Sequence, residues 1–360
     1  MCRVIQNART AARCRTPRTQ SGLGKKLFLS LASVLIVLGV PEAVLRIGGY
    51  ERRTPVFHMK FHVPEIESAG YDRDPILFWK LKRRFSGQVS ENHPWHVTIN
   101  SQRMRGADRP LEKPPGTFRI ILIGDSTTFG WGVAEEQTYG RVLETLFQNS
   151  HPQANVEVLN AGVPGYSSYQ GSKYLKRDLL KYRPDVVLVY FGLNDLTGAR
   201  YHADKEQRFF ENYQANPVAS LAYRLRTYQL LCDVVSRYTT ETRFDAYFAA
   251  TRHFRVAPED YRANLNAMKE LGWTHGFQTF FITPVWYDQR GELFDYPFWL
   301  ERQITMLAGV SPVIDTYSVV KREKSHAGEL FLDTAHPTKQ GHRLIAETIH
   351  QALLAHGAVR

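Results

Sequence analysis

Cysteine is scarce in this sequence, with Cys2, Cys14 and Cys232 the only three among 360 residues. Two of the three stand within the first fourteen positions, so the rest of the chain contains one cysteine and cannot form a disulfide within itself. A cysteine-based metal cluster needs several closely spaced cysteines and is excluded as well. Internal repeats and low-complexity tracts are also missing, and the composition is ordinary for a globular enzyme.

Acidic residues are absent from the first 26 positions, where seven basic residues stand: Arg3, Arg9, Arg13, Arg15, Arg18, Lys25 and Lys26. The net charge of the whole chain is +11, so this tail accounts for +7 and the other 334 residues for only +4. The remainder is therefore only mildly basic, whereas a nucleic-acid-binding domain is typically strongly basic. We therefore expect no nucleic-acid partner.

Residues 27–40 form an apolar stretch, but its fourteen residues are short for a membrane span and suit the h-region of a signal peptide. Extension to Gly48 reaches the length of a span, although it then includes Pro41, Glu42 and Arg46. Three interpretations are open: an uncleaved signal anchor, a cleaved signal peptide and a buried core helix.

We expect the uncleaved anchor, because no small-x-small cleavage site and no lipobox cysteine follow the stretch. The basic residues ahead of it predict a cytoplasmic N-terminus. The expected topology is a cytoplasmic tail over 1–26, a single transmembrane helix over 27–48 in the cytoplasmic (inner) membrane, and an extracytoplasmic, periplasmic remainder. The predicted membrane contact is therefore this helix.

The remainder of the chain divides at about Phe118. Residues 49–117 carry turn residues, aromatics and charge without a periodic pattern, and we interpret them as a linker and N-terminal extension with one short strand near Trp95–Asn100. From Phe118 onwards, strands and helices alternate. The expected strands are 120–123, 156–161, 185–191, 278–283 and 313–315, and the expected helices are 137–147, 170–182, 258–273 and 338–356.

This alternation predicts an α/β domain over residues 118–360, with a parallel sheet and helices on both of its faces. Residues 196–257 break the pattern, because they are polar, rich in aromatics and only partly helical. We interpret them as an insertion over the carboxyl edge of the sheet, where open α/β sheets bind their ligands.

Four short polar blocks follow the expected strands or precede the last helix. They are Gly124-Asp125-Ser126, Gly162 in Asn-Ala-Gly, Gly192-Leu193-Asn194-Asp195 and Asp333-Thr334-Ala335-His336. A serine hydroxyl becomes a useful nucleophile when an imidazole removes its proton, and that imidazole needs a carboxylate on its other nitrogen. The developing oxyanion needs fixed donors, for which the backbone N–H groups of Ser126 and Gly162 and the amide of Asn194 are candidates.

These blocks resemble, in order, the conserved blocks of the SGNH (GDSL-type) hydrolases, over about residues 118–356. The chain also resembles bacterial envelope members with an N-terminal anchor and a strand like Val97–Asn100 ahead of the core. The resemblance implies a flavodoxin-like three-layer sandwich whose five parallel strands have the order 2-1-3-4-5. It implies Ser126 as nucleophile, His336 as base, Asp333 as its orienting acid, and Gly162 and Asn194 as oxyanion donors.

The expected function is a serine esterase that removes acyl groups, such as acetyl, from a carbohydrate, another envelope substrate or a small ester, with no metal or organic cofactor. Two alternatives remain open: an O-acyltransferase that uses the same residues to acylate a polysaccharide, and a non-catalytic envelope-binding protein on an esterase scaffold. The sequence leaves the oligomeric state undetermined.

Four further residues near the blocks receive an interpretation. We expect Trp131 and Tyr166, which flank two of the blocks, to contact substrate. Asp125 is expected to tie loops together rather than to perform chemistry. His342 is expected on the surface of the last helix, with a role as the base a lesser alternative.

Overall fold

The computed structural model covers the full chain and describes residues 21–50, 70–74, 76–89, 95–196, 203–206, 221–222, 224–231, 234, 254–287, 312–323 and 327–359. The chain forms two compact units. The first consists of Met1–Arg52 and Leu221–Arg237, and the second of Arg53–Ser220 and Tyr238–Arg360. The expected insertion at 196–257 is therefore divided between the units, and most of it lies outside the described residues.

The first unit is built on helix α1 (Ser21–Ile47), which includes the apolar stretch of the sequence. Near its C-terminal end, the Glu42 carboxylate accepts hydrogen bonds from the backbone N–H and the hydroxyl of Thr227, both at 3.0 Å. Arg46 donates to the carbonyl of Arg224 at 2.7 Å. Part of the expected insertion therefore packs on α1.

No helix in the described part of the chain is both long and apolar enough to cross a membrane. The transmembrane anchor expected over residues 27–48 is therefore not supported. Helix α1 covers nearly all of that segment, but Pro41, Glu42 and Arg46 stand in its last part, after the apolar stretch.

The second unit contains a five-stranded parallel sheet with the order β6-β5-β7-β8-β9, which is the expected order 2-1-3-4-5. Its strands are β5 (Thr117–Gly124), β6 (Asn155–Asn160), β7 (Val186–Tyr190), β8 (Gln278–Ile282) and β9 (Val313–Ile314). The apolar runs of β5 and β7 pair in register, with Ile120 opposite Val186 and Ile123 opposite Val189. All four of these residues are buried, as a strand covered on both faces requires.

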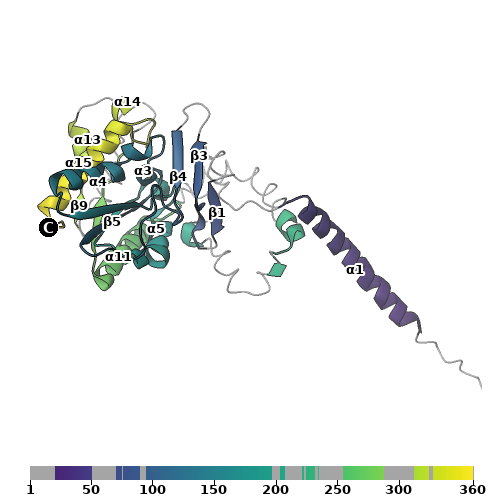
Figure 1. Ribbon diagram of the computed structural model, residues 1–360. Coiled ribbons are helices and arrows are strands. Elements are labelled where there is room, and N and C mark those ends of the chain that lie inside the picture. Colours follow the sequence, from purple (N-terminus) through teal and green to yellow (C-terminus); the bar gives the residue numbers. More distant parts are fainter. Residues whose placement is uncertain are drawn as a thin grey trace, which may run out of the picture. The chain divides into compact units, whose positions relative to one another are not determined.

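Helices cover both faces of this sheet (Figure 1). Four of them are α4 (Tyr139–Ser150), α5 (Ser168–Tyr174), α11 (Pro258–His275) and α15 (Lys339–Ala355). Helices α4 and α15 pack on one face, where Leu143 and Ile349 join the cluster around Leu122. Helices α5 and α11 pack on the other face, where Leu265 joins the cluster around Ile121.

The other helical segments of this unit are α3 (Ser126–Phe129), η2 (Glu135–Gln137), η3 (Leu175–Leu179), η4 (Leu180–Tyr182), α6 (Leu193–Leu196), η5 (Asp204–Glu206), α13 (Thr316–Arg322) and α14 (Ala327–Leu330), within the described residues. The helix expected over 170–182 is thus α5 followed by a π-helical turn and a 3₁₀ turn. Three of the helices begin at residues that favour a helix N-terminus. The Thr138 and Thr338 hydroxyls accept backbone N–H groups in the first turns of α4 and α15, and Pro258 is the first residue of α11.

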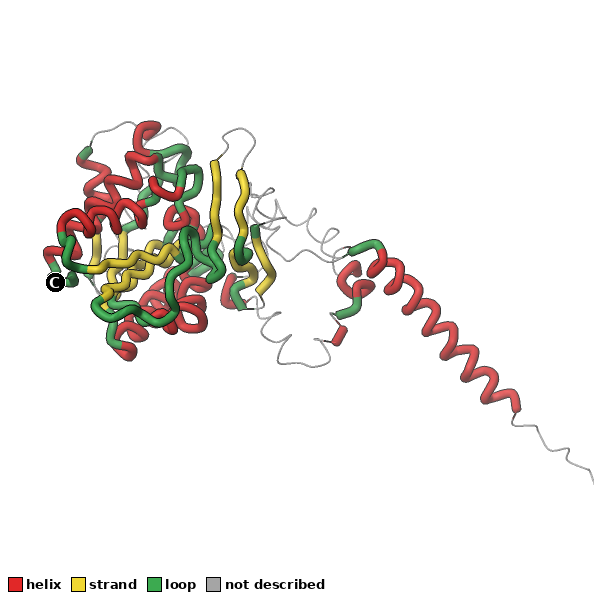
Figure 2. Tube along the Cα trace, in the orientation of Figure 1, coloured by secondary structure: helices red, strands yellow, loops and turns green. Residues whose placement is uncertain are grey.

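The N-terminal extension differs from the expectation of a linker with one strand. It contains β1 (Tyr71–Asp74), β2 (Phe78–Leu81), β3 (Phe85–Val89) and β4 (Trp95–Ile99), paired as two antiparallel hairpins drawn in yellow in Figure 2. Buried side chains of these strands share one hydrophobic core with β5 and α11. Strands β1–β3 have only four or five residues each, β1 and β2 are interrupted by charged residues and β3 contains Gly87, so the sequence shows no clear strand pattern and tertiary packing forms them.

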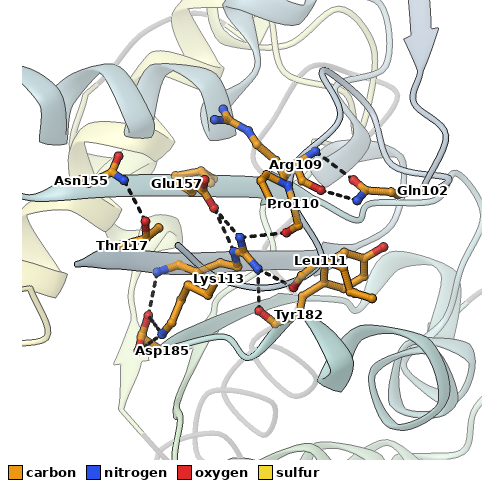
Figure 3. Close-up of polar contacts among 12 residues, drawn as sticks. Gln102, Arg109, Pro110, Leu111, Lys113, Thr117, Asn155, Glu157, Tyr182 and Asp185 are labelled. Carbon is orange, nitrogen blue, oxygen red and sulfur yellow. Dashed lines mark hydrogen bonds and ion pairs between the residues drawn. The ribbon is translucent and has the colours of Figure 1, made fainter. Parts of the chain in front are cut away.

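A buried ion pair fixes the amino ends of the strands, at the opposite edge of the sheet from Gly124. Arg119 of β5 is fully buried and donates to Glu157 of β6 at 2.7 and 2.9 Å. The same guanidinium donates to the carbonyls of Pro110, Leu111 and Tyr182 (Figure 3). These carbonyls belong to the segment ahead of β5 and the turn ahead of β7. The ion pair therefore holds the segments at the amino ends of the strands together, whereas the polar blocks lie at the carboxyl ends.

Candidate active site

Ser126 stands where β5 ends and α3 begins. The chain turns at Gly124, where an added Cβ would lie 1.9 Å from Thr128 Oγ1, so only glycine fits. Asp125 caps the short helix by accepting the backbone N–H of Thr127 at 2.9 Å. Ser126 is partly exposed, whereas both of its neighbours are buried. The hydroxyl is thus presented to solvent on a fixed backbone.

His336 and Asp333 lie in the loop ahead of α15, and the structure brings both to Ser126. His336 Nε2 lies 2.8 Å from Ser126 Oγ, and His336 Nδ1 lies 2.6 Å from Asp333 Oδ2. The other oxygen of Asp333 accepts the backbone N–H groups of Ala335 and His336, both at 2.8 Å. This turn fixes the carboxylate against the ring.

Asp333 is ionised at neutral pH. Partial burial by itself raises the pKa of its carboxyl, but the hydrogen bond and charge of His336 and the two backbone N–H groups outweigh burial and lower the pKa to about 2. A carboxylate on Nδ1 fixes the imidazole tautomer with Nε2 free to accept the serine proton. The arrangement can therefore activate the Ser126 hydroxyl.

Asn194 lies in α6, at the carboxyl end of β7, with its side chain held by a buried carboxylate. Its amide donates to Asp125 Oδ2 at 3.0 Å. Burial raises the pKa of Asp125 to about 6, although the Thr127 N–H, the charge of His336 and the Asn194 amide each act to lower it. Asp125 thus ties the Ser126 turn to the Asn194 turn, which is the structural role expected for it.

Gly162 packs directly on α3, where an added Cβ would lie 2.3 Å from the backbone nitrogen of Phe129. Its backbone N–H donates to Asn160 Oδ1 at 3.0 Å. Asn160 in turn donates to the carbonyl of Thr128 at 2.8 Å. The close approach expected at Gly162 is present, while its N–H already has an acceptor within the protein.

The two residues expected to contact substrate differ in their surroundings. Trp131 is partly exposed, and its ring lies 5.8 Å from the His336 ring between centroids. Tyr166 is 1% exposed, and its hydroxyl donates to the carbonyl of Trp79 at 2.5 Å. Tyr166 is therefore a core residue, and its expected substrate contact is wrong because the extension covers it.

His342 is a second correction, since it is fully buried rather than on the surface of α15. Its Nδ1 accepts the backbone N–H of Tyr139 at 3.3 Å, and the two rings are stacked with centroids 6.0 Å apart. Burial and the charges of Arg105 and His336 lower the pKa of His342 to about 3, so the ring is neutral. It supports α4 rather than serving as the base.

Asp195, next to Asn194, is also fully buried. Its Oδ1 accepts the backbone N–H and the hydroxyl of Ser168, at 2.9 and 2.5 Å. Burial raises the pKa of Asp195 to about 7, although the Ser168 bonds and the charge of Arg255 act in the opposite direction. These contacts join the turn after β7 to the start of α5.

Arg255 and Asp204 form a buried ion pair that the sequence pattern did not reveal, at 2.9 Å. Asp204 Oδ2 also accepts the Ser167 hydroxyl at 2.6 Å, and Arg255 donates to the carbonyl of Gly165 at 2.9 Å. Both charged residues lie in the segment interpreted as an insertion, where no periodicity points to burial. At its two ends this segment is therefore joined to the loop after β6.

Within the described residues, no group of three or more His, Cys, Asp or Glu side chains is placed to hold a metal ion. The groups available at the carboxyl ends of the strands are a hydroxyl, an imidazole and a carboxylate, each in hydrogen-bond contact with the next. A hydrogen-bonded serine, histidine and aspartate of this kind can perform nucleophilic acyl transfer.

The model of the GDSL-like Lipase/Acylhydrolase family matches residues 122–344, which include all four polar blocks. The chain belongs to this family. It is accordingly a serine ester hydrolase with an α/β fold. No curated protein sequence matches the chain.

Several solved structures are similar to the chain at low sequence identity. An α/β hydrolase, LAE5, from the metagenome of Lake Arreo in Spain is 17% identical, with a TM-score of 0.44, and the match covers 68% of this chain and 96% of that one. The acetylxylan esterase Axe2 from Geobacillus stearothermophilus is 17% identical, with a TM-score of 0.45 and the same coverage of 68% and 96%. A putative lipolytic protein of the G-D-S-L family from Desulfitobacterium hafniense is 16% identical, with a TM-score of 0.41, and the match covers 65% and 99%.

Burial of Asp195 makes the stability of the protein depend on pH. Because its folded pKa lies near 7 and its ordinary value is 3.8, the folded protein binds this proton more tightly than the unfolded chain does. The stability contributed by protonated Asp195 is therefore lost as the pH rises between these values. In urea unfolding at about pH 5 and about pH 8, we expect Asp195→Asn to lose less stability over this interval than the wild type.

The exposed Asp108, changed to Asn, is the matched control and should retain the pH dependence of the wild type. An Asp195→Asn protein whose stability falls with pH as steeply as that of the wild type would show that Asp195 does not titrate in this interval.

Proposed function

We propose that the protein removes acyl groups from an ester substrate through a covalent intermediate on Ser126. In this proposal His336 is the general base and Asp333 orients it. The observation that carries the proposal is the continuous contact from Ser126 Oγ to His336 Nε2 and from His336 Nδ1 to Asp333 Oδ2, at 2.8 and 2.6 Å. Both distances are hydrogen-bond distances, as proton transfer from Ser126 to His336 requires.

In the first half of the reaction, Ser126 Oγ attacks the carbonyl carbon of the ester while its proton passes to His336 Nε2. The imidazolium that forms is stabilised by the ionised Asp333. When the tetrahedral intermediate collapses, His336 returns the proton to the oxygen of the leaving alcohol. The acyl group then remains on Ser126 as an ester.

In the second half, water takes the place of the alcohol. His336 removes a proton from the water, the hydroxide attacks the acyl carbon, and the proton returns to Ser126 Oγ as the carboxylic acid leaves. The reaction needs no oxidant, reductant or further group, since every proton is held by His336 in turn.

The oxyanion donors in the proposal are the backbone N–H groups of Ser126 and Gly162 and the side-chain amide of Asn194. Asn194 is suited to this because Asp125 accepts one of its N–H groups and so fixes the amide plane. The Gly162 N–H would have to be shared between Asn160 Oδ1 and the oxyanion. Loss of one such donor typically costs about 3 kcal/mol of transition-state stabilisation.

The proposed substrate is an acylated carbohydrate or another acylated envelope component, with acetyl as the acyl group. Support comes from the resemblance of the chain to bacterial envelope members of the family, which have a strand like Val97–Asn100 ahead of the core. The partly exposed Trp131 beside His336 agrees with a substrate larger than a simple alkyl ester.

Hydrolysis of an acetylated oligosaccharide, followed by mass spectrometry of the products, tests the proposal. We expect the wild type to release free acid and deacetylated sugar. The Ser126→Ala variant should lose activity by several orders of magnitude while its thermal unfolding stays near that of the wild type, because the residue is partly exposed and no core packing is removed.

The same assay with an added acceptor oligosaccharide separates the proposal from the two alternatives. Acylated acceptor formed faster than free acid would identify an O-acyltransferase. Binding of the oligosaccharide without turnover, unchanged in Ser126→Ala, would identify a binding protein on an esterase scaffold.

We further propose that the catalytic unit lies outside the cytoplasm. The support is the basic tail over 1–26 followed by the apolar stretch over 27–40, the order found in exported proteins. A C-terminal fusion to a phosphatase that is active only outside the cytoplasm should be active. Activity from a cytoplasmic reporter alone would contradict the proposed location.

A further inference from the structure

Trp131 follows α3 and lies against the proposed base. Its ring plane is tilted by 34° to the ring of His336, with the centroids 5.8 Å apart. At the next residue, Gly132, an added Cβ would lie 2.4 Å from the side chain of Leu332, which is itself exposed. The loop after Ser126 and the loop that carries His336 therefore pack on each other, and Trp131 and Leu332 provide apolar surface beside the imidazole.

The N-terminal extension supports Trp131 from behind. The indole ring of Trp95, in β4, lies 5.3 Å from that of Trp131 and 6.2 Å from the ring of Phe129, edge-on in both cases. Trp95 is buried. Trp131 is thus in ring contact with Trp95 on one side and with His336 on the other.

Arg105, just after β4, holds the backbone of the same loop. Its guanidinium donates to the carbonyls of Phe129, Gly130 and Val133, at 2.7, 2.5 and 2.6 Å. It also lies over the ring of Trp95, 5.3 Å from the centroid. Gly130 is in the left-handed region with φ of 85°, so the loop takes a conformation that its glycine permits and Arg105 holds in place.

Arg105 is itself fixed to the sheet. Its backbone N–H donates to the carbonyl of Asn160, at the end of β6, at 3.1 Å. It is 4% exposed, so its charge is held by protein carbonyls and aromatic rings. Both Trp95 and Arg105 lie ahead of residues 122–344, the part matched by the family model.

The position of Trp131 indicates which part of an ester it meets. In acyl transfer the base returns its proton to the oxygen of the leaving alcohol, so that oxygen comes within hydrogen-bond distance of His336 Nε2. The acyl oxygen turns away from the imidazole, toward the oxyanion donors. A side chain that packs on the His336 ring therefore lies on the side of the alcohol.

We propose that Trp131 is a specificity-determining residue for the leaving alcohol, and that Arg105 and Trp95 are positioning residues that hold it beside His336. The alcohol that suits this surface is a sugar ring, whose C–H groups pack on an aromatic residue while its hydroxyls remain in water. This inference rests on the proposed esterase function and narrows its substrate to acylated carbohydrates.

A pair of esters with the same acyl group and different alcohols tests the inference. An acetylated methyl glycoside places a sugar ring at the alcohol side, whereas methyl acetate leaves nothing there for Trp131 to contact. We expect Trp131→Ala to lower kcat/KM for the acetylated glycoside about tenfold or more, the usual effect of losing one good apolar contact, and to change kcat/KM for methyl acetate less than about twofold. Trp131→Phe, which keeps an aromatic ring, should restore part of the difference.

The positioning role predicts the same selective loss in variants of the extension. Arg105→Lys keeps the positive charge but cannot reach three carbonyls at once. It should reproduce the pattern of Trp131→Ala, and the double variant should lose no more selectivity than Trp131→Ala alone, because both changes remove one interaction. Trp95→Phe tests the same contact if the lysine variant does not fold.

Trp273→Ala is the matched control, because Trp273 is 85% exposed on α11, and it should leave both esters unaffected. An equal loss on both esters in Trp131→Ala would overturn the inference, since Trp131 would then act on His336 itself. Additive losses in the double variant would overturn the role of Arg105. Equal kcat/KM of the wild type for methyl acetate and for the glycoside would overturn the assignment of a sugar as the alcohol, but not the proposed esterase function. Inactivity toward both esters would overturn the sugar assignment and the esterase function together.

Discussion

The hydrogen bond of 2.8 Å between Ser126 Oγ and His336 Nε2 joins residues that are 210 positions apart in the chain. It forms only if the carboxyl end of β5 and the loop ahead of α15 meet at the same place. The sheet order places β5 between β6 and β7, and α15 packs against α4 on one face, so both loops arrive at the carboxyl ends of the strands. Much of the second unit holds these two loops in place and so maintains the contact between Ser126 and His336.

Buried charges provide much of that support, and they do so at both edges of the sheet. At the amino edge, Arg119 and Glu157 tie the strands to the segment ahead of β5. At the carboxyl edge, Asp125 joins the Ser126 and Asn194 turns, and Arg105 holds the loop that carries Trp131. A buried charge is costly unless it is well paired, so these pairs favour the one arrangement that satisfies them. The same requirement makes the carboxyl edge rigid, as a preorganised active site needs to be.

The sequence predicted the part of the fold that follows simple periodicity. The strands of the sheet and the helices on its faces were expected, because continuous apolar runs and amphipathic helices leave clear patterns, whereas the strand order was implied by the resemblance to the SGNH hydrolases. The approach of Ser126, Asp333 and His336 was also expected, because the resemblance to the SGNH hydrolases implies that these three residues act together. The roles of these residues stay predictions until they are tested.

Other features could not be predicted, for reasons that lie in tertiary packing. Strands β1–β3 are short, and β1 and β2 carry charged residues, so these strands form because the core around Trp79 and Trp95 covers them. Tyr166 and His342 stand beside polar blocks in the sequence, yet the extension covers Tyr166 and Tyr139 stacks on His342. Arg105 has no motif around it, since its three acceptors are backbone carbonyls of a loop that begins 24 positions away.

The central claim is that the contact with His336 activates Ser126, and covalent labelling with a fluorophosphonate tests it most directly. The reagent forms a stable bond with a serine only when a base withdraws the hydroxyl proton. Peptide mapping by mass spectrometry should find the label on Ser126 in the wild type and little or none in His336→Ala. Label on another residue, or equally rapid labelling of Ser126 in the His336→Ala variant, would contradict the account.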